Sequence, residues 1–399
     1  MKKSAVAIIK GKKNPDQKEI DGMVRKAIQL IGGIEDIVQK GDLVLIKPNV
    51  CSISPPVEAS NTDPRVCKTL ADMVKESGGR PIIAEASTVG VDTEEAFRVN
   101  GYDELRKEGY EVIDLKKTEA VKVRVEKGKA IKHVLIYRLA LDAKVIISVP
   151  VLKTHDLEPA TLSLKNMKGL LPDSEKRKFH TTYGVMQAVA DLNTLILPKM
   201  AVVDGIIAGQ GMGSPFREGL EMDLIIAGKD PLAVDAISAR VMGIDPKTIR
   251  HLTLAEAHGL GTIDPERIQV VGNRVADVRH KFKTVEDVVK EDVDLSQFRL
   301  IYGDNACTGC RSVVYYWLKT LKEQKRIGCL KGMTILMGKN NFILPEVEKE
   351  RLLLVGICTK SLKKRGRYVE GCPPYSFHLS REMLQTDIEP PWVNPKESR

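Results

Sequence analysis

Short apolar runs alternate with amphipathic stretches over the first 290 residues of the chain. This alternation is typical of a mostly parallel β-sheet covered by helices. A polar break within residues 121–138 predicts an antiparallel hairpin laid onto that body. The runs expected to form the other strands are residues 42–50, 80–87, 143–153, 200–205, 223–228 and 268–272. The sequence therefore predicts an α/β fold, with a large first domain at residues 1–290.

Two helices have recognisable beginnings in the sequence. Asp63 precedes Pro64, and Asp230 precedes Pro231. A side chain that can cap a helix, followed by proline, is a common helix start, because the fixed φ of proline suits the first turn. We expect helices to begin at both places, the second running to Met242.

A charged stretch at residues 274–294 marks the expected boundary between two domains. Beyond it, each of four apolar runs leads into a turn that contains glycine. These runs lie in the segments FRLIYGDNAC, MTILMG, RLLLVGIC and RYVEGC. The pattern predicts a smaller second α/β domain at residues 291–399.

Four of the seven cysteines lie in this second domain at suggestive positions. Cys307 and Cys310 are separated by two residues, and Cys307, Cys358 and Cys372 each follow an apolar run. The carboxyl ends of parallel strands gather at one edge of an open sheet, where ligands bind. Four thiolates that converge suit a 4Fe–4S cluster. We therefore predict these four cysteines as its ligands, in a cluster-binding C-terminal domain.

Structural zinc and unliganded thiols are the alternatives for these cysteines. A zinc ribbon usually brings two close pairs, and this spacing is too irregular for one. Pro373 stiffens the loop after Cys372, which favours a ligand. Cys329 is the alternative fourth ligand, whereas Cys67 falls on an amphipathic helix and is expected to be structural. Cys51 follows a strand. It could face a cleft, but we favour a placement in which it does not.

Polar residues also follow the predicted strands of the large domain. Lys153 ends the run at 143–153, and His155 follows it by two positions. Lys165 and His180 come soon after. Lysines clamp carboxylates or phosphates, and a histidine moves protons near neutral pH. These four residues are the predicted catalytic site for a small anionic substrate. The alternative is that they are ordinary solvated side chains.

Two further segments are predicted to bind a cofactor or ligand at the same sheet edge. Lys47 and Asn49 close one strand. Gly209, Gly211 and Gly213 are expected to form a ligand-cradling loop after another, with a merely flexible crossover as the alternative. The glycine spacing fits neither the dinucleotide fingerprint nor a P-loop.

Composition narrows the expected partners. The chain has 62 Lys and Arg against 53 Asp and Glu, a formal charge of +9, which predicts a solvated surface, with attraction of an acidic partner as the alternative. Aromatic residues make up 5%, so stacking on nucleic acid is not expected. Part of the basic excess lies at Lys360, Lys363, Lys364, Arg365 and Arg367.

Location is predicted from what the sequence lacks. No apolar run of 18 residues exists, so no membrane span is expected. The short apolar stretch near the N-terminus is followed by lysines and is expected to be a strand, not a signal peptide. The protein is therefore expected in the cytoplasm, where disulfides are rare. Its oligomeric state stays open.

Several long motifs resemble the uncharacterised family called domain of unknown function 362, over roughly residues 40–290. They are IKPNV, PVLKTH, LSLKNMKGLLP, VVDGIIAGQGMG and AGKDPLAVDAISARVMGIDP. The resemblance implies an iron–sulfur segment, which members often carry as compact C-x-x-C-x-x-C runs. This chain departs from that pattern, with only one close pair. Its GCPP segment is similar to the cluster loop of hydrogenase small subunits and the related respiratory-complex subunit.

Three functions are compatible with these features. The first is a redox enzyme whose cluster exchanges electrons with a small anionic substrate. The second is a non-redox hydratase, isomerase or racemase that uses the cluster or a metal as Lewis acid. Proton transfer between His155 and His180 would belong there and distantly resembles nickel-dependent lactate racemase. The third is an electron carrier or partner-binding protein that serves a redox partner protein.

Overall fold

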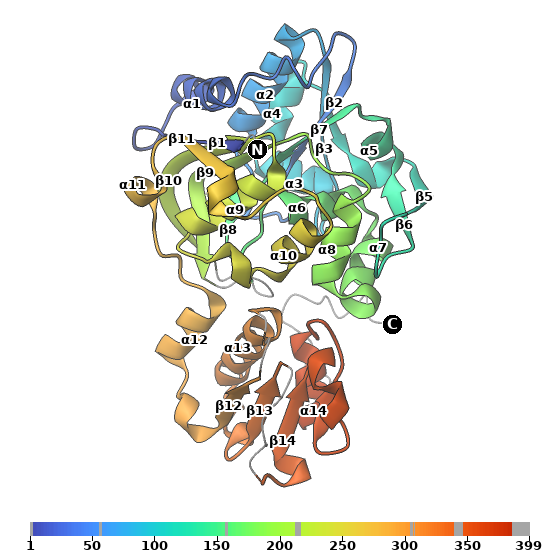
Figure 1. The fold of residues 1–399 in the computed structure, drawn as a ribbon, viewed down its shortest axis with the longest axis vertical. Helices are drawn as coiled ribbons and strands as arrows, with labels where there is room; N and C mark the ends of the chain where they lie inside the picture. The colour runs from blue at the N-terminus through green and yellow to red at the C-terminus, as the bar shows by residue number, and fades with distance from the viewer. Residues whose placement is uncertain are drawn as a thin grey trace. The chain divides into compact units, whose positions relative to one another are not determined.

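The computed structural model describes residues 3–55, 58–155, 159–211, 217–303, 306, 308–338 and 346–384, without the side chains of His180, Thr181 and Thr308. The chain forms two compact units (Figure 1). The first unit consists of Met1–His155, Ala160–Phe179 and Met186–Phe282. The second consists of Asp156–Pro159, His180–Val185 and Lys283–Arg399. None of the described helices is long and apolar enough to cross a membrane.

A nine-stranded sheet forms the centre of the first unit, with strand order β11-β1-β10-β9-β7-β2-β3-β4 and β8 paired to β9. Only β10 runs antiparallel to its neighbours, β1 and β9. The predicted mostly parallel sheet is therefore confirmed. Its strands are β1 Ser4–Lys10, β2 Leu43–Pro48, β3 Arg80–Glu85, β4 Val112–Asp114, β7 Val145–Val149, β8 Val151–Lys153, β9 Met200–Gly211, β10 Arg217–Gly228 and β11 Ile268–Gly272.

Helices cover both faces of this sheet. Helices α1 and α2 pack on one face, where alternate strand residues such as Val44 and Ile46 point into a continuous apolar core. Helices α9 and α6 contact β7, β9 and β10 and cover the other face. The helices of this part are α1 Gln17–Leu30, α2 Pro64–Glu76, α3 Thr93–Val99, α4 Tyr102–Lys107, α5 Arg138–Asp142, α6 Ser163–Asn166, α7 Asp173–Lys178, α8 Val185–Asn193, α9 Pro231–Val241, α10 Arg250–Ala257 and α11 Val275–Val278.

The two predicted helix starts are confirmed. The Asp63 carboxylate accepts a hydrogen bond from the backbone N–H of Arg65, and α2 begins at Pro64. The Asp230 carboxylate likewise accepts from the N–H of Ala233 at the start of α9. Each cap satisfies an N–H that has no partner within its helix.

One predicted strand differs from the structure. The run at 143–153 divides into β7 and β8 at Pro150, because proline has no N–H to donate to a ladder. The predicted antiparallel hairpin at 121–138 is confirmed: β5 Ala120–Arg124 pairs with β6 His133–Tyr137 in a two-stranded sheet.

The expectation of a glycine-rich loop is wrong for residues 209–211, which continue strand β9. Gly209 pairs with Gly219 of β10, and Gly211 pairs with Arg217. A Cβ atom on Gly209 would lie 2.4 Å from Cδ of Arg217, so glycine leaves room for that side chain to cross the strand. Gly213 lies outside the described residues.

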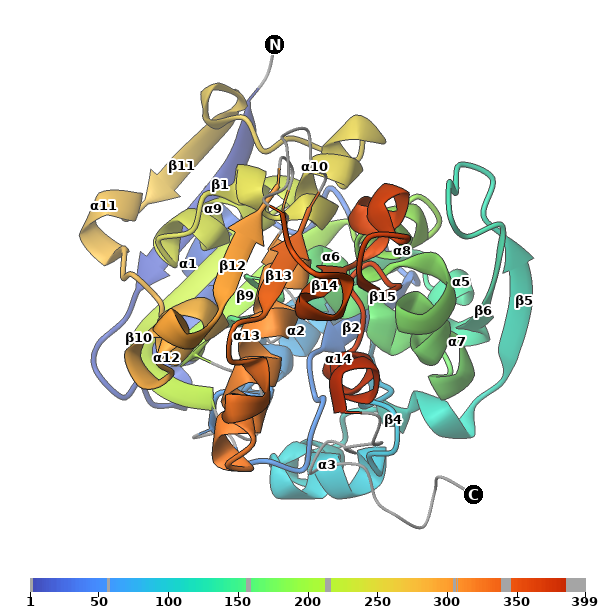
Figure 2. The same ribbon diagram turned by 90° about the horizontal axis from the view of Figure 1, so that it is seen from below.

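The second unit contains a four-stranded parallel sheet in the order β12-β13-β14-β15 (Figure 2). This confirms the smaller second α/β fold, while the domain boundary at residue 290 stays a prediction. Trp317 of α13 is fully buried and donates its indole N–H to Oγ of Ser380 in α14 at 2.9 Å. The elements are β12 Arg299–Tyr302, β13 Thr334–Met337, β14 Leu352–Val355, β15 Arg367–Val369, α12 Val285–Asp292, α13 Thr308–Glu323 and α14 Ser376–Leu384.

Candidate functional site

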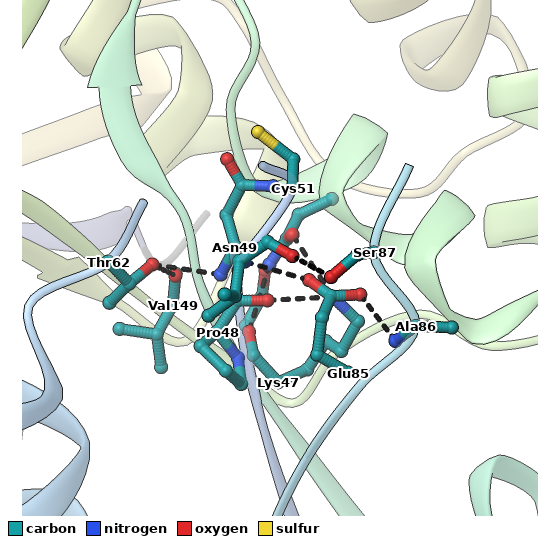
Figure 3. Close-up of polar contacts among 12 residues, drawn as sticks. Lys47, Pro48, Asn49, Cys51, Thr62, Glu85, Ala86, Ser87 and Val149 are labelled. Carbon is teal, nitrogen blue, oxygen red and sulfur yellow. Dashed lines mark hydrogen bonds and ion pairs between the residues drawn. The ribbon is translucent and has the colours of Figure 1, made fainter. Parts of the chain in front are cut away.

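Polar side chains gather in the first unit where the parallel strands end, in two clusters. The first centres on Lys47 and Glu85, at the ends of β2 and β3 (Figure 3). Lys47 is 0% exposed, and its Nζ donates to Oε2 of Glu85 at 2.7 Å. The same ammonium donates to the carbonyl of Pro48 at 2.7 Å and to Oδ1 of Asn166 at 3.3 Å.

This buried ion pair is fully hydrogen-bonded. The Glu85 carboxylate also accepts from the backbone N–H groups of Val50 at 3.0 Å and Ala86 at 2.8 Å. Burial raises the pKa of Glu85 and lowers the pKa of Lys47, and their attraction opposes both shifts. Because all three ammonium protons are engaged inside the protein, Lys47 ties β2 to β3 and α6. Its cofactor-binding role stays a prediction.

Asn49 lies just beyond β2. Its backbone N–H donates to Oγ1 of Thr62 at 2.8 Å, and that hydroxyl donates to the carbonyl of Val149 at 2.7 Å. The side-chain Oδ1 of Asn49 is buried and has no hydrogen-bond partner among the described residues. An acceptor in this position suits a donor on a ligand, and binding by Asn49 remains a prediction.

The second cluster centres on Lys153 at the end of β8. Lys153 is only 3% exposed, and its Nζ donates to the carbonyl of Ser60. The same Nζ lies 3.4 Å from Sγ of Cys51, and that sulfur lies 3.3 Å from the Ser60 carbonyl. The Cys51 thiol and the buried Lys153 ammonium thus both contact the carbonyl of Ser60.

The surroundings of Lys153 are positively charged. Burial lowers the pKa of Lys153 to about 8; Cys51 opposes that shift, and the charges of Arg217 and Lys165 add to it. Arg217 donates to Oγ of Ser60 at 2.9 Å, and Lys165 is 5% exposed. In the part of the chain that the structure describes, no carboxylate lies within ion-pair distance of Lys153. Such a cluster suits an anionic ligand.

Asp235 of α9 fixes the short helix that carries Lys165. Its two carboxylate oxygens accept from the backbone N–H groups of Ser163 at 2.8 Å and Leu164 at 3.0 Å, at the start of α6. Burial raises the pKa of Asp235 to about 7. Asp235 therefore acts as a cap for the start of α6.

The remaining predicted residues of the large domain are placed only in part. His155 follows β8 and is half-buried. His180 belongs to the second unit, and its side chain is outside the described part of the chain. Proton transfer between the two histidines stays a prediction. Sequence reasoning missed Arg217 because it lies on β10, 64 positions from Lys153, and no local pattern marks it.

Three of the four predicted cluster ligands are described in the second unit. Cys310 is buried in the first turn of α13. Cys358 is exposed in the 3-10 segment Ile357–Leu362 after β14, and Cys372 is half-buried after β15. Cys307 lies outside the described residues.

The loops that carry these cysteines meet at one edge of the sheet. The N–H of Ile357 donates to the carbonyl of Gly371 at 2.9 Å, and the N–H of Gly356 donates to the carbonyl of Val369 at 2.9 Å. A Cβ atom on Gly356 would lie 2.7 Å from Sγ of Cys310. Glycine thus provides a space beside the sulfur that any other residue would fill.

A thiolate-bound metal centre is compatible with this edge. Thiolates are the donors that iron–sulfur clusters use, and the loops of Cys358 and Cys372 touch beside the sulfur of Cys310. Within residues 308–338 and 346–384, no three His, Cys, Asp or Glu side chains form a ready group of metal ligands. Cys329 precedes β13 and so lies at the opposite edge of the sheet. Cys67 is buried on α2, where burial raises the pKa of its thiol.

Comparisons with known proteins support the resemblance found in the sequence. Residues 44–240 match the family described as Domain of unknown function (DUF362). The thylakoid-associated protein sll1697 of Synechocystis sp. is 28% identical over 243 residues, covering 59% of this chain and 74% of that protein.

A solved structure, the lactate racemase apoprotein from Thermoanaerobacterium thermosaccharolyticum, has 11% sequence identity and a TM-score of 0.36. The match covers 86% of this chain and 71% of that one, and a likeness this low carries no argument about the reaction. The family match spans Lys47, Cys51, Lys153, Lys165 and Arg217. The match to the DUF362 family model over residues 44–240 thus agrees with the resemblance that the motifs indicated.

Proposed function

We propose that this chain is an iron–sulfur protein, with a 4Fe–4S cluster held by Cys307, Cys310, Cys358 and Cys372, and that it is a redox enzyme for a small anionic substrate. The observation that carries the proposal is the contact between the loops of Cys358 and Cys372 beside the sulfur of Cys310 at one sheet edge. A bound cluster would supply one-electron transfer.

Residues around the cysteines would help to hold the cluster. Cys310 lies in the first turn of α13, where backbone N–H groups and the helix dipole favour a thiolate. Gly356 has a φ of +87° and Gly371 a φ of +151°, conformations that glycine adopts without a Cβ penalty. The two glycines let the loops of Cys358 and Cys372 approach each other.

The substrate would bind in the first unit. Lys153, Lys165 and Arg217 bring positive charge to the edge where β8 and β9 end. Lysine and arginine side chains bind carboxylate and phosphate groups, and a small molecule that carries such a group would suit this cluster. We therefore assign anion binding to the cluster around Lys153; the ammonium of Lys47 bonds Glu85.

Serine substitutions test the ligand set. The full-length protein should be purified without oxygen and its iron–sulfur absorbance compared among variants. Cys310→Ser, Cys358→Ser and Cys372→Ser should each remove or weaken the absorbance, because serine replaces a thiolate ligand. Cys67→Ser and Cys329→Ser are the matched controls and should retain the absorbance. Cys67 is buried on α2, and Cys329 lies at the opposite edge of the sheet. Loss in Cys329→Ser with retention in Cys358→Ser would contradict the assignment.

A further inference from the structure

Cys51 and Lys153 form a pair that the proposed cluster does not use. Cys51 is half-buried just beyond β2, and Figure 3 shows its sulfur pointing away from the Lys47–Glu85 pair. Its Sγ lies 3.4 Å from Nζ of Lys153, close enough for a proton to pass between them. The thiol is thus the accessible member of the pair and the amine the buried one.

The buried side-chain amide of Asn61 makes several hydrogen bonds to the loop of Cys51. Oδ1 of Asn61 accepts from the backbone N–H groups of Cys51 at 2.8 Å and Ser52 at 3.2 Å. Nδ2 of Asn61 donates to the carbonyl of Ser54 at 2.8 Å and to Oδ1 of Asn100 at 3.2 Å. A reactive group positioned in this way needs little reorganisation on binding a substrate.

We propose that Cys51 is a nucleophile for small anionic carbonyl compounds, with Lys153 as its proton acceptor and with Arg217 and Lys165 as the charges that attract the anion. Activation of a thiol by an adjacent base is a general route to covalent catalysis. The inference deepens the anion-binding role proposed for the first unit and on that point rests on it. It does not depend on the cluster, so iron analysis and thiol chemistry test the two proposals separately.

The covalent step needs no further reactant. Lys153, with its pKa lowered to about 8, has a neutral fraction near neutral pH and accepts the thiol proton. The sulfur then bonds to the carbonyl carbon as the C=O π bond breaks, and the oxygen takes that electron pair. Lys153 returns the proton to this oxygen, which gives a thiohemiacetal-type adduct.

Alkylation of the full-length protein, as purified, tests the inference without any variant. Iodoacetate carries a negative charge and iodoacetamide does not, so the ratio of their rates reports the local charge. Rates at Cys51, Cys67 and Cys329 are measured by peptide mass spectrometry and normalised to 2-mercaptoethanol, a neutral thiol in the same solution. We expect the iodoacetate preference at Cys51 to exceed that of 2-mercaptoethanol by about tenfold, because the cations concentrate anions.

Variants separate the base from the anion site. Lys153→Met should slow both reagents at Cys51 by about tenfold or more, because the proton acceptor is gone. Arg217→Gln should reduce only the iodoacetate preference. Lys176→Met is the matched control, because Lys176 is also a buried lysine with a pKa lowered to about 8 but bonds Asp173 and the carbonyls of Ala86 and Ser87.

Glyoxylate tests the carbonyl class directly. This small anionic aldehyde should protect Cys51 from iodoacetamide, whereas neutral acetaldehyde at the same concentration should protect it less. The inference is overturned if wild-type Cys51 reacts no faster than 2-mercaptoethanol, if it shows no preference for iodoacetate, or if glyoxylate gives no protection.

Discussion

Lys47 and Glu85 illustrate how a residue that looks functional in sequence can hold the fold together. The sequence predicted that Lys47 lies at the end of a strand and binds a ligand there. The structure confirms its position at the end of β2. Its partner is 38 residues away on β3, and no local pattern links the two. The contacts of a buried lysine depend on the tertiary fold, so the sequence cannot reveal whether its charge is already compensated.

Removing one partner of this pair should be costly. Lys47→Met leaves the Glu85 carboxylate buried without its counter-charge and should lower the free energy of unfolding by about 3–5 kcal/mol. Adding Glu85→Leu should recover much of that loss. Urea unfolding of the single and double variants measures both effects. Lys107→Met, in the exposed pair with Glu104, is the control and should have far less effect; an equal loss there would contradict the argument.

The cap residue Asp235 should make stability depend on pH. Its pKa is about 7 in the folded protein and ~4 in an unfolded chain, so the folded state binds the extra proton between these values. Its contribution is therefore fully present below about pH 4 and is lost as the pH rises through 7. Asp235→Asn should flatten this part of the curve, measured by urea unfolding between pH 4.5 and 8. The prediction would be refuted if the wild-type stability rose from pH 4.5 to 8 and Asp235→Asn abolished that rise.

At the scale of elements, local chemistry predicted where helices begin, whereas the lengths of β9 and β10 depend on their pairing. The starts of α2 and α9 follow from Asp63 and Asp230, because caps act within three residues. The extension of β9 to Gly211 was missed, since glycines read as a loop until the pairing with β10 is known. Arg217 enters the candidate site only through that pairing.

The absence of a side chain at Gly209 should therefore be needed for the position of the Arg217 side chain. Gly209→Ala places a Cβ atom 2.4 Å from Cδ of Arg217 and 3.0 Å from the carbonyl of Ala59. We expect a loss of about 1–3 kcal/mol in unfolding free energy and a reduced iodoacetate preference at Cys51. Gly22→Ala in α1 is the control, because nothing lies within 4 Å of the added Cβ; it should stabilise the protein by about 0.5–1 kcal/mol. If Gly209→Ala left the iodoacetate preference at Cys51 unchanged, Arg217 would not contribute to the site.

Gly356 should matter for the cluster in the same steric way. Gly356→Ala puts a Cβ atom 2.7 Å from Sγ of Cys310, at a backbone φ of +87°. The added atom should displace the sulfur, and the iron content per chain should fall. Gly328→Ala, which meets nothing within 4 Å, should keep the wild-type content. Equal iron in both variants would show that the space beside Cys310 is not needed.

For the whole molecule, topology explains what the sequence could predict. Parallel strands deliver their following loops to one edge, so apolar runs followed by polar residues were enough to place Lys153, Cys358 and Cys372. Pairing between distant residues, such as Cys51 with Lys153, depends on which strands are neighbours in the sheet. Periodicity along the chain does not contain that order.

Metal analysis is the direct test of the 4Fe–4S cluster that we propose for the second unit. Full-length protein is purified without oxygen, and its iron, acid-labile sulfide, nickel and zinc are measured per chain. We expect about four irons and four sulfides, together with an electron paramagnetic resonance signal that appears on reduction. Colourless protein with one stoichiometric zinc and no sulfide would contradict the claim.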